Sequence, residues 1–206
     1  MSILDSDSTT DVPVSLVKKG DNISLLKKAP SLKKVRVVVG WSEDRCLDGV
    51  EPDLDVSIFM LTSKGKVRAS MDLIFYNTPN KKSICGSVVH GGDVKGGGSE
   101  EFMVADLQTL PSAIVTLAIV VTIDKADMLN LNFGVVSPAY INLIDDDTDQ
   151  VISTSNLSTD SAGATSLLFG EVHRRNGNWQ YSHIERPCDG GLLEFCNEYG
   201  VKSKDE

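Results

Sequence analysis

Short runs of β-branched and aromatic residues recur along most of this 206-residue chain, and they limit its fold more than any other feature. Each run is bounded by Gly, Pro, Asn or Asp, which interrupt regular structure and favour turns. The runs span residues 35–39, 56–61, 73–76, 87–89, 102–107, 114–123, 140–144, 167–173 and 179–184. This pattern predicts an all-β fold, a two-sheet antiparallel β-sandwich with a few short helices.

Local signals refine this prediction at the C-terminal end. Asn176-Gly177 suits the positive φ angles of a type I′ turn and predicts a hairpin between its two flanking runs. Apolar residues spaced for one helical face predict a closing helix over 191–200, with Gly200 as its C-cap. A second short helix is predicted over 124–132, with Asp124 as its N-cap.

The chain is predicted to form one domain over residues 13–201, with polar, unpatterned tails at 1–12 and 202–206. The longest apolar run, 113–123, is about half the length that a membrane span needs, so we interpret it as a strand buried on both faces. The first residues are acidic and lack the apolar stretch of a secretion signal, so a cytoplasmic location is expected.

The acidic balance of the sequence narrows the possible partners. Acidic residues outnumber Lys and Arg by 29 to 20, which gives a formal net charge of −9. Binding nucleic acid depends on clustered basic side chains, so this balance argues against a nucleic-acid partner. Cations are the partners that such a chain favours.

Carboxylates are concentrated in the segments 44–55, 93–101 and 145–149. Calcium takes oxygen ligands from carboxylates, carbonyls and amides, which such loops supply. In 91–101 the glycines permit backbone conformations that turn carbonyls inward, so this loop is either a cation cradle or simply a flexible hairpin loop. Asp147, in the third segment, is interpreted as a solvated charge. Asp53 and Asp55 do not open an EF-hand loop, because Ile58 stands where that loop requires Gly.

Motifs of catalysis are absent from the sequence. It contains no Gly-x-Ser-x-Gly, His-Glu-x-x-His or Cys-x-x-Cys pattern, and His173 and His183 are expected to form a surface pair beside the predicted hairpin. A reductase reaction would need a thiol pair or a redox cofactor site, and the spacing of the cysteines offers no evident pair. The cysteines are expected to be reduced thiols; they are Cys46, Cys85, Cys188 and Cys196.

Eight ordered segments of the chain resemble the hallmark segments of the TerD family of tellurium-resistance and stress-response proteins. They are VSLVKKGDNISLLKK (14–28), VRVVVGW (35–41), DLDVSIFML (53–61), DLIFYN (72–77), GSVVHGGD (86–93), NFGVVSPAYI (132–141), FGEVHRRNGNWQ (169–180) and GGLLEFCNEYGV (190–201). The resemblance implies a β-sandwich, a calcium-binding role without an established enzymatic reaction, and association with other stress-response proteins of the same system.

The resemblance also implies a set of metal ligands. The acidic positions of the family fall on Asp53, Asp55, Asp72, Asp93 and Glu101, and a strand-end amide falls on Asn77; Glu100 joins them from the same loop. The chain departs from the family pattern at Val94, Ser99 and Ser70, and its Gly-rich loop is shorter. Each change removes an oxygen ligand or a charge, so two hypotheses stay open: a calcium-binding stress protein, or a family member with a degenerate metal site that acts as a scaffold or partner-binding module.

Overall fold

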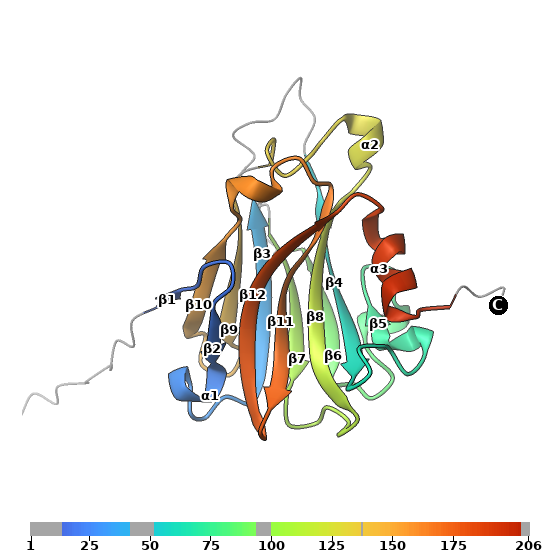
Figure 1. The fold of residues 1–206 in the computed structure, drawn as a ribbon. Coiled ribbons are helices and arrows are strands. Elements are labelled where there is room, and N and C mark those ends of the chain that lie inside the picture. The colour runs from blue at the N-terminus through green and yellow to red at the C-terminus, as the bar shows by residue number, and fades with distance from the viewer. Residues whose placement is uncertain (1–13, 42–51, 94–99, 137, 203–206) are drawn as a thin grey trace, which may run out of the picture.

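The computed structural model describes residues 14–41, 52–93, 100–136 and 138–202, and these form two six-stranded sheets packed face to face (Figure 1). The first sheet has the strand order β1-β10-β9-β3-β7-β6. Its strands are β1 (Ser15–Leu16), β10 (Val151–Asn156), β9 (Ala139–Asp145), β3 (Lys34–Trp41), β7 (Glu100–Asp106) and β6 (Val88–Asp93). Every pairing in it is antiparallel except β1 with β10, which is parallel.

The second sheet has the order β2-β12-β11-β8-β4-β5, and its pairings are all antiparallel. Its strands are β2 (Asn22–Ser24), β12 (Asn178–Cys188), β11 (Ser166–Arg175), β8 (Ile114–Ile123), β4 (Leu54–Thr62) and β5 (Leu73–Ile74). The predicted two-sheet sandwich is therefore confirmed. The sequence patterns did not reveal β1, β2 or β10.

The helices are short and lie at the ends and on the outer face of the sandwich (Figure 1). They are α1 (Leu25–Lys28), α2 (Ala126–Leu129), α3 (Gly191–Tyr199) and the 3-10 turns η1 (Ser70–Asp72), η2 (Pro79–Lys81) and η3 (Thr159–Ser161). The closing helix is confirmed as α3, which ends at Gly200 in the left-handed conformation. The helix predicted over 124–132 is wrong in extent: α2 covers only Ala126–Leu129, and its N-cap is Lys125 rather than Asp124.

Burial on both faces of β8 explains its continuous apolar sequence. Ile119 and Val121 belong to a cluster that fills the space between the sheets, and Val120 belongs to a second cluster on the outer face. Phe195 and Tyr199 of α3 complete that outer cluster. The helix is therefore a partial third layer that covers β8 and β4.

The hairpin between β11 and β12 forms at the predicted turn. Arg175 pairs with Asn178, and both Asn176 and Gly177 have positive φ angles, as a type I′ turn requires. The expected surface pair of histidines on this hairpin is wrong, however. His173 is half-buried, and His183 is only 1% exposed.

His183 is buried because it belongs to a polar network inside the second sheet. Its Nε2 lies 2.6 Å from Oε1 of Glu185, and its Nδ1 lies 3.3 Å from the hydroxyl of Tyr181. Ser158 donates to the other Glu185 oxygen from its backbone N–H, at 3.1 Å, and from its hydroxyl. Burial lowers the pKa of His183, and hydrogen bonding to Glu185 opposes that shift. The network satisfies a carboxylate that would otherwise be costly inside the protein.

Cys85, Cys188 and Cys196 are free thiols, whereas Cys46 and both predicted tails apart from Lys202 lie outside the described residues. No helix in the described part of the chain is long and apolar enough to cross a membrane.

Candidate metal centre

Three aspartates meet where β4 begins and β8 ends. The two strands are antiparallel neighbours, with Leu54 opposite Ile123 and Asp55 opposite Thr122. Beyond the paired residues, the backbone N–H of Asp124 donates to the backbone carbonyl of Asp53 at 2.8 Å. Strand pairing therefore brings Asp124 beside Asp53 and Asp55, although about 70 residues of sequence separate them.

Glu101 reaches the same end of the sandwich from the first sheet. It alternates along β7 with exposed positions and faces inward, where only 4% of its surface is exposed. One carboxylate oxygen accepts a hydrogen bond from the backbone N–H of Val56, which lies in the second sheet. The other lies 3.0 Å from Nε2 of buried His90, an ion-pair distance at which the angles do not form a hydrogen bond. Glu101 thus links the two sheets beside Asp55.

These neighbours change the ionisation of Asp55. Burial is the largest cause, and the negative charges of Glu101, Asp53 and Asp124 add to it, so that the pKa of Asp55 rises from 3.8 to about 7. The nearby His90 opposes the shift only weakly. Around neutral pH, Asp55 therefore either holds a proton or carries a charge that a cation would stabilise.

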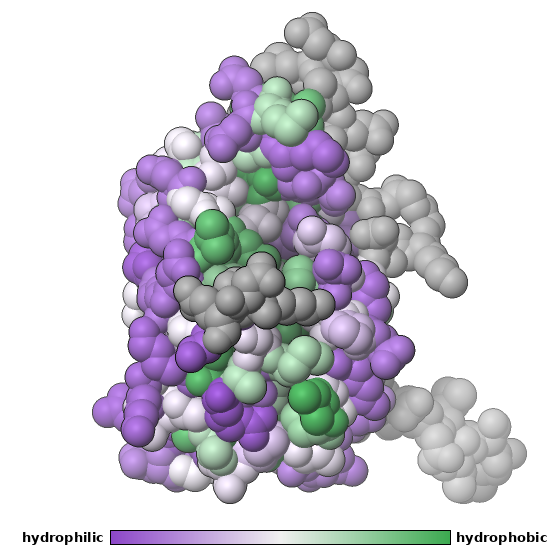
Figure 2. Space-filling model, turned by 90° about the vertical axis from the view of Figure 1, so that its right-hand side faces the viewer, coloured by the Kyte–Doolittle hydropathy of each residue, from purple (hydrophilic) through white to green (hydrophobic). Residues whose placement is uncertain are grey.

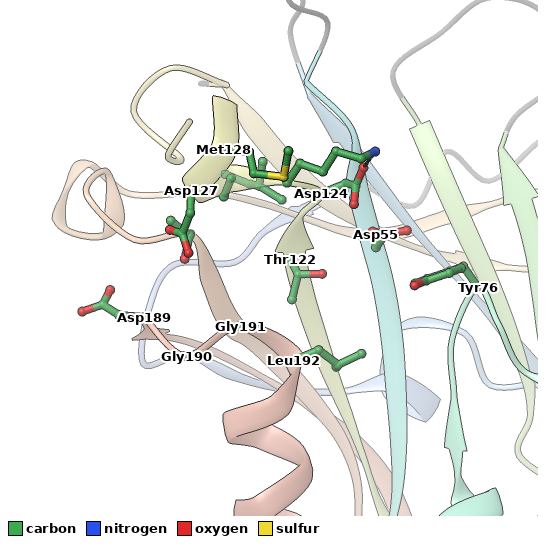
Figure 3. A pocket seen from close by; sticks show the side chains of 14 residues that line it. Asp55, Tyr76, Thr122, Asp124, Asp127, Met128, Asp189, Gly190, Gly191 and Leu192 are labelled. Carbon is green, nitrogen blue, oxygen red and sulfur yellow. Dashed lines mark hydrogen bonds and ion pairs between the residues drawn. The ribbon is translucent and has the colours of Figure 1, made fainter. Parts of the chain in front are cut away.

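Asp55 also lines an acidic pocket of about 520 Å³ that opens between β8, α2 and the start of α3 (Figure 3). Asp55 and Tyr76 lie on one side of this pocket, and Asp127 and Asp189 lie on the other. Lys125 is the one basic side chain among the described lining residues, and it pairs with Asp124. The pocket therefore carries an excess of negative charge.

Glu100 does not share the environment of Glu101. Successive residues of a strand point to opposite faces, so Glu100 lies on the outer face of the first sheet. There it accepts a hydrogen bond from the hydroxyl of Tyr140 on β9. Burial and this acidic neighbour raise the pKa of Tyr140 to about 12.

The structure does not bring Asp72 to the group around Asp55. Leu73, the next residue, pairs with Phe59, which is four residues along β4 from Asp55 and so about 13 Å away. Both carboxylate oxygens of Asp72 accept hydrogen bonds from the Arg68 guanidinium, at 2.7 and 2.8 Å. Asp72 therefore has a positively charged partner of its own, and the geometry does not support its predicted role as a metal ligand.

The structure describes the side chain of Asn77 but only the backbone of Asp93. Asn77 is exposed and lines a separate, more apolar pocket, whereas its neighbour Tyr76 lines both pockets. The backbone of Asp93 pairs with Glu101 at the acidic end, but its side chain lies outside the described residues, as does the Gly-rich segment 94–99. Among the groups that the structure describes, no three His, Cys, Asp or Glu side chains lie close enough together to hold a metal ion.

The acidic run 145–149 lies at the opposite end of β3. Asp146 pairs with Arg36 at 3.3 Å, Asp149 pairs with the same guanidinium, and Asp147 lies 3.7 Å from Nζ of Lys34. Two basic residues at the start of β3 therefore neutralise this acidic run. Asp147 is accordingly a suitable control for the acidic group at the other end.

Sequence reasoning missed Asp124, Asp127, Asp189 and His90 as members of this region. Asp124 directly follows the predicted strand 114–123, and Asp53 lies three residues before the predicted strand at 56–61, so a correct pairing of these two strands would have joined them. Nothing in the local sequence distinguishes His90 from a surface histidine.

The protein is thus a β-sandwich of two six-stranded sheets, with several carboxylates at one end. The model of the TerD domain family matches residues 14–199, so the chain belongs to the TerD family. It is 41% identical to "Tellurium resistance protein TerD" of Serratia marcescens over 91% of this chain and 97% of that protein. It is 35% identical to "General stress protein 16U" of Bacillus subtilis over 89% of this chain and 96% of the relative.

A solved structure supports the fold. A homologue of telluride resistance protein (TerD) from Streptomyces coelicolor A3(2) superposes with a TM-score of 0.61 at 20% identity, covering 84% of this chain and all of that chain. The family match and the named relatives together place the chain in a family of tellurium-resistance and stress-response proteins.

Proposed function

We propose that the chain is a non-enzymatic, cytoplasmic calcium-binding protein of the TerD-type stress response, with the cation held at the acidic end of the sandwich. Asp53, Asp55 and Asp124 would supply ligands from the second sheet, and Glu101 would add negative charge from the first. The side chains of these residues do not surround a common point in the structure, so binding would have to draw them together. The observation that carries the proposal is the position of Asp55, a half-buried carboxyl group at one end of the sandwich whose pKa is raised by burial and by the charges of three other carboxyl groups.

The chemistry of these groups suits a hard cation. Their side chains offer oxygen donors, which calcium prefers over nitrogen or sulfur. Repulsion among the carboxylates opposes their joint ionisation, and a divalent cation would relieve that repulsion. Binding would then favour the charged form of Asp55 and release its proton.

The described carboxylates are too few to complete the coordination shell of calcium. Calcium takes about six to eight oxygens, and three carboxylates supply only part of that shell. Asp72 is paired with Arg68, and Glu101 already accepts from Val56 and lies against His90. These pairings favour the second candidate function, a TerD-family scaffold whose metal site is degenerate.

Isothermal titration calorimetry with calcium distinguishes the two candidates. If calcium displaces the proton of Asp55, titrations at pH 6 in two buffers of different ionisation enthalpy should report about one proton released per ion. Between pH 5 and pH 7, the dissociation constant should weaken by up to about tenfold for each unit that the pH is lowered. Asp55→Asn should weaken binding at pH 8 by about tenfold or more.

Asp147→Asn is the matched control, because it removes an aspartate at the other end of the sandwich, where Lys34 and Arg36 balance the charge. It should leave calcium binding unchanged. No heat of binding with millimolar calcium at pH 8 would reject the calcium proposal in favour of the scaffold. Binding that persists in Asp55→Asn without proton release would place the ion elsewhere.

A further inference from the structure

A second pocket, of about 950 Å³, runs along α3 on the outer face of the second sheet. Leu192, Leu193 and Cys196 of α3 form one wall, and the segment 70–81, which contains β5 and its flanking turns, forms the other. Most of the exposed lining is apolar because Met71, Leu73 and Phe75 face it from the second wall. The pocket is therefore a groove between a helix and the edge of a sheet; we call it the α3 groove.

Large apolar side chains are exposed in the α3 groove. Met71 is 37% exposed, Tyr76 52% and Leu193 69%, so none of them is held by the hydrophobic core. Figure 2 shows this face, where apolar surface interrupts the polar surface. Exposed apolar side chains that gather in one hollow, rather than lying singly, are typical of a surface that binds a partner.

The α3 groove is continuous with the acidic pocket described above. Tyr76 and Leu192 line both, so an apolar hollow leads directly toward Asp127 and Asp189. Two lysines, Lys81 and Lys202, line the groove itself, and Lys202 follows the C-terminal end of α3. The combined surface is therefore acidic at the start of α3, apolar along it and basic beyond its end.

These charges indicate what occupies the surface. A second copy of this chain also carries a net charge of −9, so self-association would bring like charges together. The residues after Lys202 are Ser-Lys-Asp-Glu, which have no apolar side chain to fill the groove. A segment of another protein that combines cationic and aliphatic side chains complements both parts of the surface.

We propose that the α3 groove and the acidic pocket together dock an extended segment of a partner protein, in which a Lys or Arg side chain lies a few residues from aliphatic ones. The cationic side chain enters the acidic pocket near Asp127 and Asp189, and the aliphatic side chains cover Leu193 and Met71. Leu193 lies in the first turn of α3, four residues after Asp189, and Leu192 lines both pockets, so the cationic and aliphatic side chains need to be only a few residues apart.

The proposal does not depend on calcium binding. Asp127 and Asp189 are outside the set of carboxylates proposed to hold the ion, and the α3 groove contains none of that set. Asp55 and Asp124 of that set do line the acidic pocket, so peptide binding is measured with a calcium chelator present, where no ion competes. Failure of the docking proposal would therefore leave the calcium proposal standing, and the reverse also holds.

The test uses the full chain as bait for a display library of random twelve-residue peptides, with Leu193→Asp and Ile84→Asp as paired variants. Both replaced side chains are highly exposed, 69% and 79%, so neither change disturbs the core, but Ile84 lines neither pocket. Enriched peptides should carry Lys or Arg within a few residues of Leu, Ile, Val or Met. As synthetic peptides they should bind Leu193→Asp about tenfold or more weakly than the unmodified chain and Ile84→Asp.

A double variant tests the acidic pocket separately from the α3 groove. Asp127→Asn combined with Asp189→Asn should weaken peptide binding and flatten its dependence on salt concentration, because attraction between opposite charges is screened by ions. Absence of enrichment, enriched peptides without a basic residue, or binding that is unaffected by Leu193→Asp would each overturn the proposal. A dimer in sedimentation that Leu193→Asp alone abolishes would overturn it by assigning the surface to a second copy.

Discussion

The substitution Asp55→Asn tests the electrostatics of the acidic end through stability alone. The pKa of Asp55 is raised from 3.8 to about 7, so the native state holds this proton more tightly than the unfolded state does. The unfolded state releases this proton near pH 3.8, whereas the native state keeps it until about pH 7. The contribution of Asp55 to the free energy of unfolding therefore falls as the pH rises from 3.8 to 7 and is constant above that. Asn keeps the shape of the side chain and removes the charge, so the variant should lack this slope.

The expected change in stability follows from the size of the pKa shift of Asp55. Roughly three pKa units at about 1.4 kcal/mol per unit give a cost of roughly 4 kcal/mol for ionised Asp55 in the folded protein. Asp55 is only half-buried, and solvent screens its neighbours, so we discount this to about 2 kcal/mol. In calcium-free buffer at pH 8, Asp55→Asn should therefore be about 2 kcal/mol more stable than the unmodified chain, a rise of about 4 to 8 °C in Tm.

Urea denaturation with a calcium chelator at pH 5, 6, 7 and 8 measures this difference. The gap between the two proteins should narrow as the pH is lowered, because Asp55 of the unmodified chain then becomes neutral in the folded state. Asp147→Asn should follow the unmodified chain at every pH. A variant less stable than the unmodified chain at pH 8, or a gap that does not change with pH, would refute the reasoning.

Two further predictions concern groups away from the acidic end. Glu185→Ala should destabilise the fold by about 3 to 5 kcal/mol in urea titration, because it leaves buried His183 and half-buried Ser158 without their partner, whereas exposed Asp160→Ala should cost about 1 kcal/mol or less. A loss of under 1 kcal/mol in Glu185→Ala would contradict the role given to the network. Burial alone would raise the pKa of the exposed thiol of Cys85, but hydrogen bonds with Ser83 and Ser87 and the charge of Arg68 outweigh it and lower the pKa. Cys85 should therefore react fast with a thiol reagent in the folded protein, and Cys85→Ser should remove one equivalent from the fast phase; an unchanged fast amplitude would contradict this.

Much of the fold could be predicted because its strands carry their own signals. The run 114–123 became β8 with the same bounds, and Asn176-Gly177 formed the predicted turn. The strand β10 was missed because four of the six residues in its sequence, VISTSN, have hydroxyl or amide side chains, and two of its serines are buried. Strands of two or three residues, such as β1 and β2, are too short to show a period and exist only through pairing with longer neighbours.

The candidate site could be predicted only in part, since its members meet through strand pairing. Asp53, Asp55 and Glu101 do lie at the same end of the sandwich. The role of Asp72 depended on whether Arg68, four residues earlier, would bond to it, and sequence alone did not decide this. The groups around Asp55 from β8 and β6 could be recognised only once the order of strands was known.

The short outermost strands have a consequence for how this protein can meet others. Three of the four sheet edges are β1, β2 and β5, with two or three residues each, and the fourth, β6, has its register interrupted between His90 and Gly92. An incoming strand needs a long, regular row of free backbone groups to extend a sheet, and these described edges offer none. The architecture thereby resists open-ended, fibre-like stacking of copies, and it leaves recognition to side chains on the faces and ends of the sandwich.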